Sequence, residues 1–155
     1  MTIYTDGSCK GNGQKNNCGG FGVVVVDDND CEIATYSKQT NDTTNNREEL
    51  KAILYALITY GVKETAAWDT QPASPPIVYS DSAYAINTLT KWMYSWSNND
   101  WKKSNNQTPE NLDLIQAYFD LVENKGYKID LQYIKGHAGH RWNEKADQLA
   151  TGKIK

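Results

Sequence analysis

The sequence contains few of the residues that mark special classes of protein. Its 155 residues include three cysteines and four prolines. The cysteines, Cys9, Cys18 and Cys31, are odd in number and include no Cys-x-x-Cys pair, so neither a disulfide framework nor a zinc ribbon is indicated. Cys9 and Cys18 with His137 and His140 also lack the usual spacings of zinc ligands. We therefore expect a reducing, cytoplasmic compartment in which the cysteines serve as small packing residues.

Long hydrophobic runs and an excess of positive charge are missing too. No apolar stretch approaches the length of a membrane span, which excludes a membrane partner. Hydrophobic residues make up 39% of the chain and charged residues 23%, close to the usual globular composition. We expect one domain over residues 1–155, a monomer with no obligate protein partner. The net charge of −3 gives no basic footprint, so contact with nucleic acid must be local or must run through metal ions held by acids.

Alternating and β-branched residues dominate the first forty positions. They predict three strands, at Ile3–Thr5, Phe21–Val26 and Cys31–Ser37. Between the first two, Gly7-Ser8 and the glycine- and asparagine-rich residues 11–20 read as loops. Three strands joined by turns indicate an antiparallel meander.

The hydrophobic period then changes to that of a helix. Apolar residues recur at the spacing of one amphipathic face: Leu50, Ile53, Leu54, Leu57 and Ile58. Thr44, Asn45 and Asn46 are candidates for its N-cap. Asn45 and Glu48 resemble a capping box, with Glu48 turned towards solvent.

Strand and helix patterns alternate in the second half. Ile77–Asp81 reads as a strand, and a helix is expected from about Ala83 to Leu89. Thr108 and Pro109 look like the cap and first residue of the next helix. Alternating apolar residues at 129–133 predict the last strand. One face of a final helix carries the apolar residues Trp142, Ala146, Leu149 and Ala150. The order β-β-β-α-β-α-α-β-α implies an α/β fold with a mixed sheet and helices on its faces.

Two acids sit at matching places, each at the predicted end of a strand. Asp6 follows the first strand and Asp81 ends the fourth. Ligands of open α/β sheets gather beyond the carboxyl ends of parallel strands, so both carboxylates reach one crevice if these strands are parallel neighbours. Taken alone, Asp81 is more typical of a helix N-cap and Asp6 of a turn.

Two further acids lie on predicted helices. Glu49 falls at the edge of the apolar stripe, where it can lean over the sheet, and Asp147 lies beside Ala146 in the last helix. Taken alone, Glu49 is more typical of a solvated boundary residue and Asp147 of a surface residue. Together the four acids predict a cluster that stays ionised only with cations, and hard oxygen ligands suit Mg²⁺ or Mn²⁺.

Five segments in order resemble the motifs of type 1 ribonuclease H. They are Thr5-Asp6-Gly7-Ser8-Cys9, Thr44-Asn45-Asn46-Arg47-Glu48-Glu49-Leu50, Tyr79-Ser80-Asp81-Ser82, Lys135-Gly136-His137-Ala138-Gly139-His140 and Asn143-Glu144-Lys145-Ala146-Asp147. The resemblance covers nearly the whole chain. It implies a five-stranded mixed sheet, with strands one to three antiparallel and strands four and five parallel to the first.

The same resemblance implies an activity. Members of this family are endonucleases that hydrolyse the RNA strand of an RNA–DNA hybrid duplex and leave 5′-phosphate and 3′-hydroxyl ends. It implies that Asp6, Glu49, Asp81 and Asp147 hold two Mg²⁺ ions, with Mn²⁺ as the alternative metal. It also implies that His137, in a glycine-flanked loop, shuttles a proton or helps the product to leave; the alternative is a loop residue that contacts only solvent.

Substrate contacts carried over from the family gather near the first loop, the first helix and a tryptophan-rich segment. They are Ser8, Cys9, Gly11, Asn12, Thr44, Asn45, Asn46, Asn87, Trp92 and Trp101. RNA is recognised through its 2′-hydroxyls in a wide minor groove. The segment 91–103 resembles the family's basic protrusion but is only modestly basic. Its tryptophans have the alternative role of pinning small helices to the body, above all Trp96.

Two other functional classes remain open. One is a nuclease or strand-transfer enzyme of the same broad fold, such as a junction resolvase or a transposase core. The other is a non-catalytic hybrid-binding module, which would be expected to have lost an acid. All four acidic positions are present in this sequence.

Overall fold

A five-stranded mixed sheet forms the centre of the computed structural model, which describes residues 1–11, 17–63, 74–136 and 138–154. The strand order is β3-β2-β1-β5-β7, with β1, β2 and β3 antiparallel and with β5 and β7 parallel to β1. The strands are β1 (Thr2–Lys10), β2 (Cys18–Val26), β3 (Glu32–Asn41), β5 (Ile77–Ser80) and β7 (Asp130–Tyr133). A separate two-residue pair joins β4 (Val62–Lys63) to β6 (Tyr127–Lys128). The predicted sheet and its topology are confirmed.

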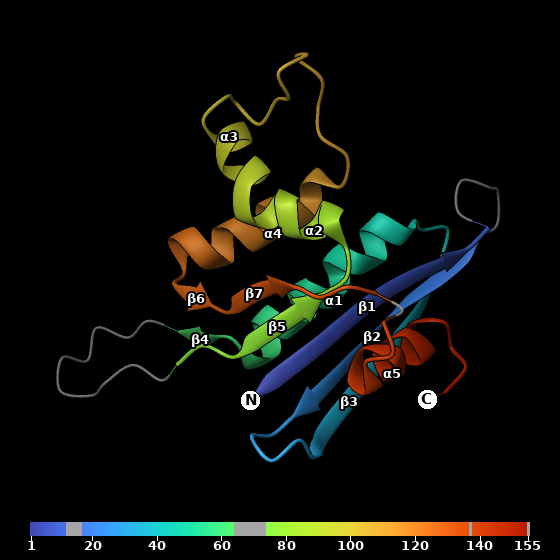
Figure 1. The fold of residues 1–155 in the computed structure, drawn as a ribbon. Coiled ribbons are helices and arrows are strands. Elements are labelled where there is room, and N and C mark those ends of the chain that lie inside the picture. Colours follow the sequence, from blue (N-terminus) through green and yellow to red (C-terminus); the bar gives the residue numbers. More distant parts are fainter. Residues whose placement is uncertain (12–16, 64–73, 137, 155) are drawn as a thin grey trace, which may run out of the picture.

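Helices cover both faces of this sheet. They are α1 (Asn45–Tyr60), α2 (Ala83–Asn87), the π-helical turn η1 (Thr88–Trp92), α3 (Met93–Ser97), α4 (Leu112–Phe119), the π-helical turn η2 (Asp120–Asn124) and α5 (Arg141–Ala150). Figure 1 shows α5 on one side of the sheet and α1 on the other, with α2 and α4 on the same side as α1. In the described ranges no helix has the length and apolar character that crossing a membrane requires.

The core has a layer on each side of the sheet because the central strands are covered twice. Val23 and Val25 of β2 pack towards α1, whereas Val24 and Val26 pack towards α5. A strand buried on both faces has no polar side to alternate with, which explains its continuous apolar run. The predicted face of the last helix is confirmed, because its four apolar residues are all buried.

Parts of both predicted loops are in fact strands. Residues Gly7 to Lys10 continue β1, and β2 begins at Cys18, so the first hairpin is longer than expected. Gly20 of the predicted loop and Gly22 of the predicted strand both allow close packing against α5. A Cβ atom on Gly22 would lie 2.6 Å from the Cβ of Leu149, because α5 crosses β2 at this point.

The start of α1 also differs from the prediction. Thr44 is the N-cap, and its hydroxyl accepts a hydrogen bond of 3.1 Å from the backbone N–H of Arg47. Asn45 is therefore the first helical residue and forms no capping box with Glu48. Glu48 is 0% exposed instead of facing solvent. Ile58, expected on the apolar face, is 56% exposed.

The later helices begin and end at positions that the sequence pattern did not predict. Thr108 and Pro109 do not cap α4, which starts after Asn111 in a left-handed backbone conformation with φ of 60°. The helix expected from Ala83 to Leu89 runs further, through η1 and α3. A π-helical turn holds one residue more than an α-helical turn. The apolar residues after it therefore no longer continue the face that the apolar residues before it follow.

We predict that Gly22→Ala destabilises the protein by about 2 kcal/mol, because overpacking a tight contact costs on the order of 1–3 kcal/mol. The added methyl group would strike α5 at Ala146 and Leu149. Urea denaturation should show a lower midpoint with an unchanged slope. Ser37→Ala, at the position paired with Gly22 on β3, is the control and should change stability by less than about 0.5 kcal/mol. An unaltered midpoint for Gly22→Ala would contradict the close packing of α5.

Candidate active site

The two strand-borne acids meet where the parallel pairing of β1 and β5 stops. The last parallel pair is Thr5 with Ser80, and the next residues are Asp6 and Asp81. Asp6 lies within β1, which continues along β2, so its interpretation as a turn residue is wrong. Asp81 is not a helix cap, because Ser82 takes that place and its hydroxyl accepts a 3.1 Å hydrogen bond from the backbone N–H of Ala85. Both carboxylates are thus free to face the same edge of the sheet.

Glu49 reaches this edge from α1 because the helix starts almost in contact with β1. A Cβ atom on Gly7 would lie 2.5 Å from the carbonyl carbon of Glu48, so only glycine permits this approach. Glu49 is 7% exposed, which excludes a solvated boundary position. One carboxylate oxygen from each of Asp6, Glu49 and Asp81 lies within 4.8 Å of the others.

Asp147 approaches the same cluster from α5, on the other face of the sheet. It is half-buried, and its carboxyl group interacts with that of Asp6 closely enough to raise the pKa of Asp6. Asp147 is not one of the three acids in the compact group. The structure therefore brings the other three predicted acids around Asp6. Asp6, Glu49 and Asp81 are close enough to share a bound metal ion.

Burial and like charge raise the pKa values of Asp6 and Glu49. Burial is the main cause that raises the pKa of Asp6, and the charge of Glu49 is the next. Burial also raises the pKa of Glu49 to about 8, against the opposing effects of the Asp6 hydrogen bond and the Gly7 backbone N–H. Neighbouring carboxylates that share a buried site cannot all ionise without a compensating cation.

The donor set fits a hard divalent metal ion. It consists of carboxylate oxygens, the ligands that Mg²⁺ and Mn²⁺ prefer. One of them, Oε2 of Glu49, is buried and has no hydrogen-bond donor. A buried oxygen without a donor is costly, and a cation bound between the acids would satisfy it.

The loop before the last helix runs directly against Asp81. A Cβ atom on Gly136 would lie 2.7 Å from Oδ2 of Asp81, so this backbone passes over the carboxylate. His137 itself lies outside the residues that the structure describes. His140, the other histidine of the motif, packs its ring 5.0 Å from that of Tyr4 and has a buried Nδ1 with no partner.

The expected substrate contacts lie on three elements beside the acids. Ser8 and Cys9 belong to β1, with Gly11 after it; Thr44, Asn45 and Asn46 begin α1; Asn87 ends α2. Most are half-buried or exposed, but Cys9 is buried, with its thiol 3.4 Å from the carbonyl oxygen of Thr43. The thiol of Cys9 is therefore turned towards Thr43 and into the protein. Asn12 lies outside the described residues.

The two predicted tryptophan contacts differ in their surroundings. Trp92 is 42% exposed at the end of η1, with its ring 6.2 Å from that of Trp96. Trp101 packs edge-on against Phe119 at 5.1 Å and joins the core. This favours a packing role for Trp101 and leaves Trp92 as the more accessible aromatic ring.

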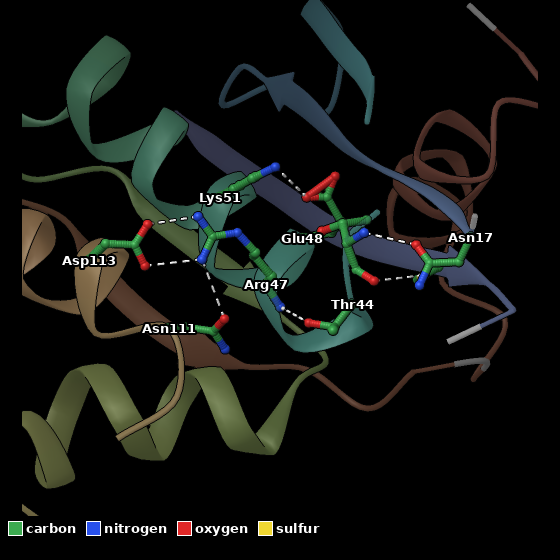
Figure 2. A network of polar contacts seen from close by, with 9 residues as sticks. Asn17, Thr44, Arg47, Glu48, Lys51, Asn111 and Asp113 are labelled. Carbon is green, nitrogen blue, oxygen red and sulfur yellow. Dashed lines mark hydrogen bonds and ion pairs between the residues drawn. The ribbon is translucent and has the colours of Figure 1, made fainter. Parts of the chain in front are cut away.

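Sequence reasoning missed a polar network at the start of α1. Figure 2 shows Arg47 with Asp113 and Asn111 on one side and Glu48 beside Lys51 on the other. The Glu48 carboxylate lies 3.1 Å from Nζ of Lys51. Arg47 and Asp113 are 66 residues apart, and no local pattern in the sequence pairs them.

Comparison with known sequences gives one consistent result. A model of the RNase H family matches residues 1–155. A ribonuclease H of Syntrophomonas wolfei is 39% identical over 157 residues, covering 100% of this chain and 96% of that protein. Ribonuclease HI of Haemophilus influenzae is 41% identical over 150 residues, covering 97% of this chain and 86% of that protein.

Solved structures agree in fold. LC9-RNase H1, a type 1 RNase H with the type 2 active-site motif, matches with a TM-score of 0.69 and 30% identity, over 96% of this chain and 69% of its own. The foamy viral protease-reverse transcriptase in complex with an RNA/DNA hybrid matches with a TM-score of 0.75 and 18% identity, over 96% of this chain and 19% of its own. At that lower identity the likeness shows the fold alone.

We predict that Asp6→Asn stabilises the metal-free protein at high pH. The raised pKa values mean that the folded state holds protons more tightly than the unfolded state. Stability from this cluster is therefore present below the unfolded value of about 4 and is lost as pH rises through about 8, the folded pKa of Glu49. At pH 8 with EDTA, the free energy of unfolding of the variant should exceed that of the wild type by at least about 1 kcal/mol. Each tenfold difference in proton affinity between the folded and unfolded states corresponds to about 1.4 kcal/mol.

Urea denaturation at pH 5 and pH 8 measures this difference, and Asp42→Asn is the matched control because Asp42 is exposed. Asparagine tolerates the positive φ of that residue. Adding MgCl₂ should stabilise the wild type more than Asp6→Asn, because a ligand that binds only the folded state raises its stability. Equal responses of the two proteins to pH and to metal would contradict a shared carboxylate site.

Proposed function

Because this chain belongs to the RNase H family, we propose that it hydrolyses the RNA strand of RNA–DNA hybrid duplexes as a metal-dependent endonuclease. Its products carry 5′-phosphate and 3′-hydroxyl ends. The observation that carries the proposal is the group formed by Asp6, Glu49 and Asp81, whose oxygens lie within 4.8 Å of one another. Buried carboxylates that repel one another are not needed for binding alone, which argues against a non-catalytic module. The relatives named above favour hybrid cleavage over strand transfer.

The metal we propose is Mg²⁺, as two ions, with Mn²⁺ as the alternative. Asp6, Glu49, Asp81 and Asp147 would hold the ions. Divalent ions bound in such sites activate water and stabilise the charge of a phosphodiester in an in-line displacement. The four carboxylates would position the metal ions rather than act as nucleophiles. Asp6 and Glu49 are buried whereas Asp81 and Asp147 are half-buried, which leaves the cluster open to solvent on the side of the latter two.

For His137 we propose a role in proton transfer or product release. A histidine with an ordinary pKa exchanges protons near neutral pH. The approach of Gly136 to Asp81 supports this role, because it brings the preceding backbone against the acids. The absence of a side chain at residue 136 is needed for that approach.

Substrate choice is proposed to rest on duplex shape. The wide, shallow minor groove of a hybrid presents 2′-hydroxyls that backbone and short polar groups can read. Ser8, Cys9, Gly11 and Asn12 would read them from the first strand and its loop, and Asn45 and Asn46 from α1. Thr44 and Asn87 would hold a phosphate of the DNA strand. Trp92 and, with less exposure, Trp101 would contact the DNA strand further along.

We further propose that the protein acts as a cytoplasmic monomer. Cys18 and Cys31 are exposed free thiols, which persist in a reducing compartment. Cys9 is also free, and it is buried.

A pair of neighbouring glutamates provides a sharp test of the site. Glu49→Gln should lower the rate of hybrid cleavage by at least about 100-fold, because it removes a charged metal ligand. Glu48→Gln makes the same chemical change one residue away, at a side chain that pairs with Lys51 outside the acidic cluster. It should leave cleavage within about tenfold of the wild type. Equal losses in both variants, measured with a labelled hybrid in Mg²⁺, would contradict the assignment of Glu49.

Substrate and metal dependence test the activity as a whole. We expect cleavage of an RNA–DNA hybrid in Mg²⁺, and poor cleavage of single-stranded RNA, duplex RNA and duplex DNA, because only the hybrid presents one RNA and one DNA backbone. EDTA should abolish cleavage of the hybrid. Comparable cleavage of duplex DNA would favour the strand-transfer class instead, and activity in EDTA would exclude the metal site.

A further inference from the structure

Arg47 makes a two-pronged ion pair that ties α1 to α4. Its Nη1 and Nη2 atoms donate hydrogen bonds to Oδ1 and Oδ2 of Asp113, at 3.0 Å and 2.7 Å (Figure 2). Parallel bonds between a guanidinium and a carboxylate fix both the distance and the angle of the partners. The hydrogen bonds from Arg47 lower the pKa of the Asp113 carboxyl group, which keeps the pair charged.

Asn111 extends this tie to a third helix. Its Oδ1 accepts from Nη1 of Arg47 at 3.5 Å, and its Nδ2 donates to the hydroxyl of Tyr84 at 3.2 Å. The residue holds a left-handed backbone conformation directly before α4, a conformation that asparagine tolerates better than most residues. A chain of side chains therefore runs from α1 through the start of α4 to α2.

The fold does not depend on this chain of contacts. Asp113 is mostly exposed and Arg47 is about one-third exposed, and exposed ion pairs contribute little to stability. The helices are held by buried apolar residues instead, among them Leu50, Ala85 and Ile115. The network orients the ends of elements that the core already holds together.

Those ends carry the proposed contacts with the duplex backbone. Thr44, Asn45 and Asn46 immediately precede Arg47 at the start of α1, and Asn87 lies one turn after Tyr84 in α2. The two groups of contacts belong to different helices. A polar link between the ends of these helices, added to the apolar core, would fix the spacing of the two groups to match that of a nucleic-acid backbone.

We propose that Arg47, Asp113, Asn111 and Tyr84 form a positioning network that sets the spacing of the two groups of backbone contacts and so governs the affinity for the hybrid. This inference rests on the proposed function. It assigns these residues no part in the chemical step, because none of them belongs to the carboxylate cluster. Loss of the network should therefore raise KM and leave kcat nearly unchanged.

A different role for Arg47 predicts the opposite sign. If Arg47 were a phosphate ligand that Asp113 merely neutralises, removing the Asp113 charge would free the cation and strengthen binding. Removing any nearby negative charge would also strengthen the binding of a polyanionic substrate. Asp113→Asn thus separates positioning, which raises KM, from electrostatics, which lowers it.

The experiment compares steady-state cleavage of a labelled hybrid in Mg²⁺ by the full chain and its variants. Asp113→Asn should raise KM about threefold or more with kcat within about twofold. Glu110→Gln, an exposed residue on the same segment, makes the same change of charge and should not raise KM. Asp113→Glu keeps a carboxylate and should restore much of the affinity. Tyr84→Phe removes the last link with no change of charge, and it should also raise KM.

The outcomes distinguish this inference from the proposed function. A wild-type protein that fails to cleave the hybrid would overturn the proposed function itself. A wild type that cleaves, with KM lowered or unchanged in both Asp113→Asn and Tyr84→Phe, would overturn the positioning network alone. If Asp113→Asn fails to fold, as judged by circular dichroism, Tyr84→Phe decides the matter, because its ring keeps the packing of Tyr84.

Discussion

Repulsion among buried carboxylates is the constraint around which this protein is built. Asp6 is 4% exposed and Glu49 is 7% exposed. Burial raises the pKa of both carboxyl groups, and nearby acids raise them further, Glu49 and Asp81 for Asp6, and Asp81 and Asp147 for Glu49. The folded chain must offset this cost through its two apolar layers, since net stability is a small difference between large terms. Natural proteins accept such local conflict mainly at functional sites. The RNase H family and the chemistry of the cluster both explain these buried acids as ligands of divalent metal ions.

Backbone contacts, more than side chains, bring the acids together. Gly7 lets α1 rest on β1, and Gly136 lets the loop before α5 pass over Asp81. The parallel pairing of β1 with β5 then places Asp6 and Asp81 as neighbours. Each of these contacts fixes main-chain positions, so the carboxylates are held by rigid elements. The polar network at Arg47 belongs to a second tier, which orients the surroundings of the site without building it.

Local patterns, namely the strand ends and an amphipathic stripe, predicted a mixed sheet and a cluster of four acids. The parallel and antiparallel pairing of the five strands came from the family resemblance. The sequence was insufficient wherever tertiary contact decided the outcome. Glu48 looked like a surface residue by helical period, yet the close approach at Gly7 buries it. Gly20 in β2 looked like a loop residue, because one of its packing partners, Ala150 in α5, lies far along the chain. Ties such as Arg47 to Asp113 join residues that no short pattern relates, and only coordinates reveal them.

The π-helical turn between α2 and α3 allows the tryptophan-rich segment 91–103 to change its orientation independently of the acidic site. A π-turn holds one residue more than an α-helical turn, and one residue corresponds to a rotation of about 100° around the helix axis. Loss or gain of a single codon within Thr88–Trp92 would swing Trp96 to another side of the helix, while Asp81, upstream of the turn, stays in place. A change of length at this point would therefore alter the surface formed by residues 91–103 without moving Asp81.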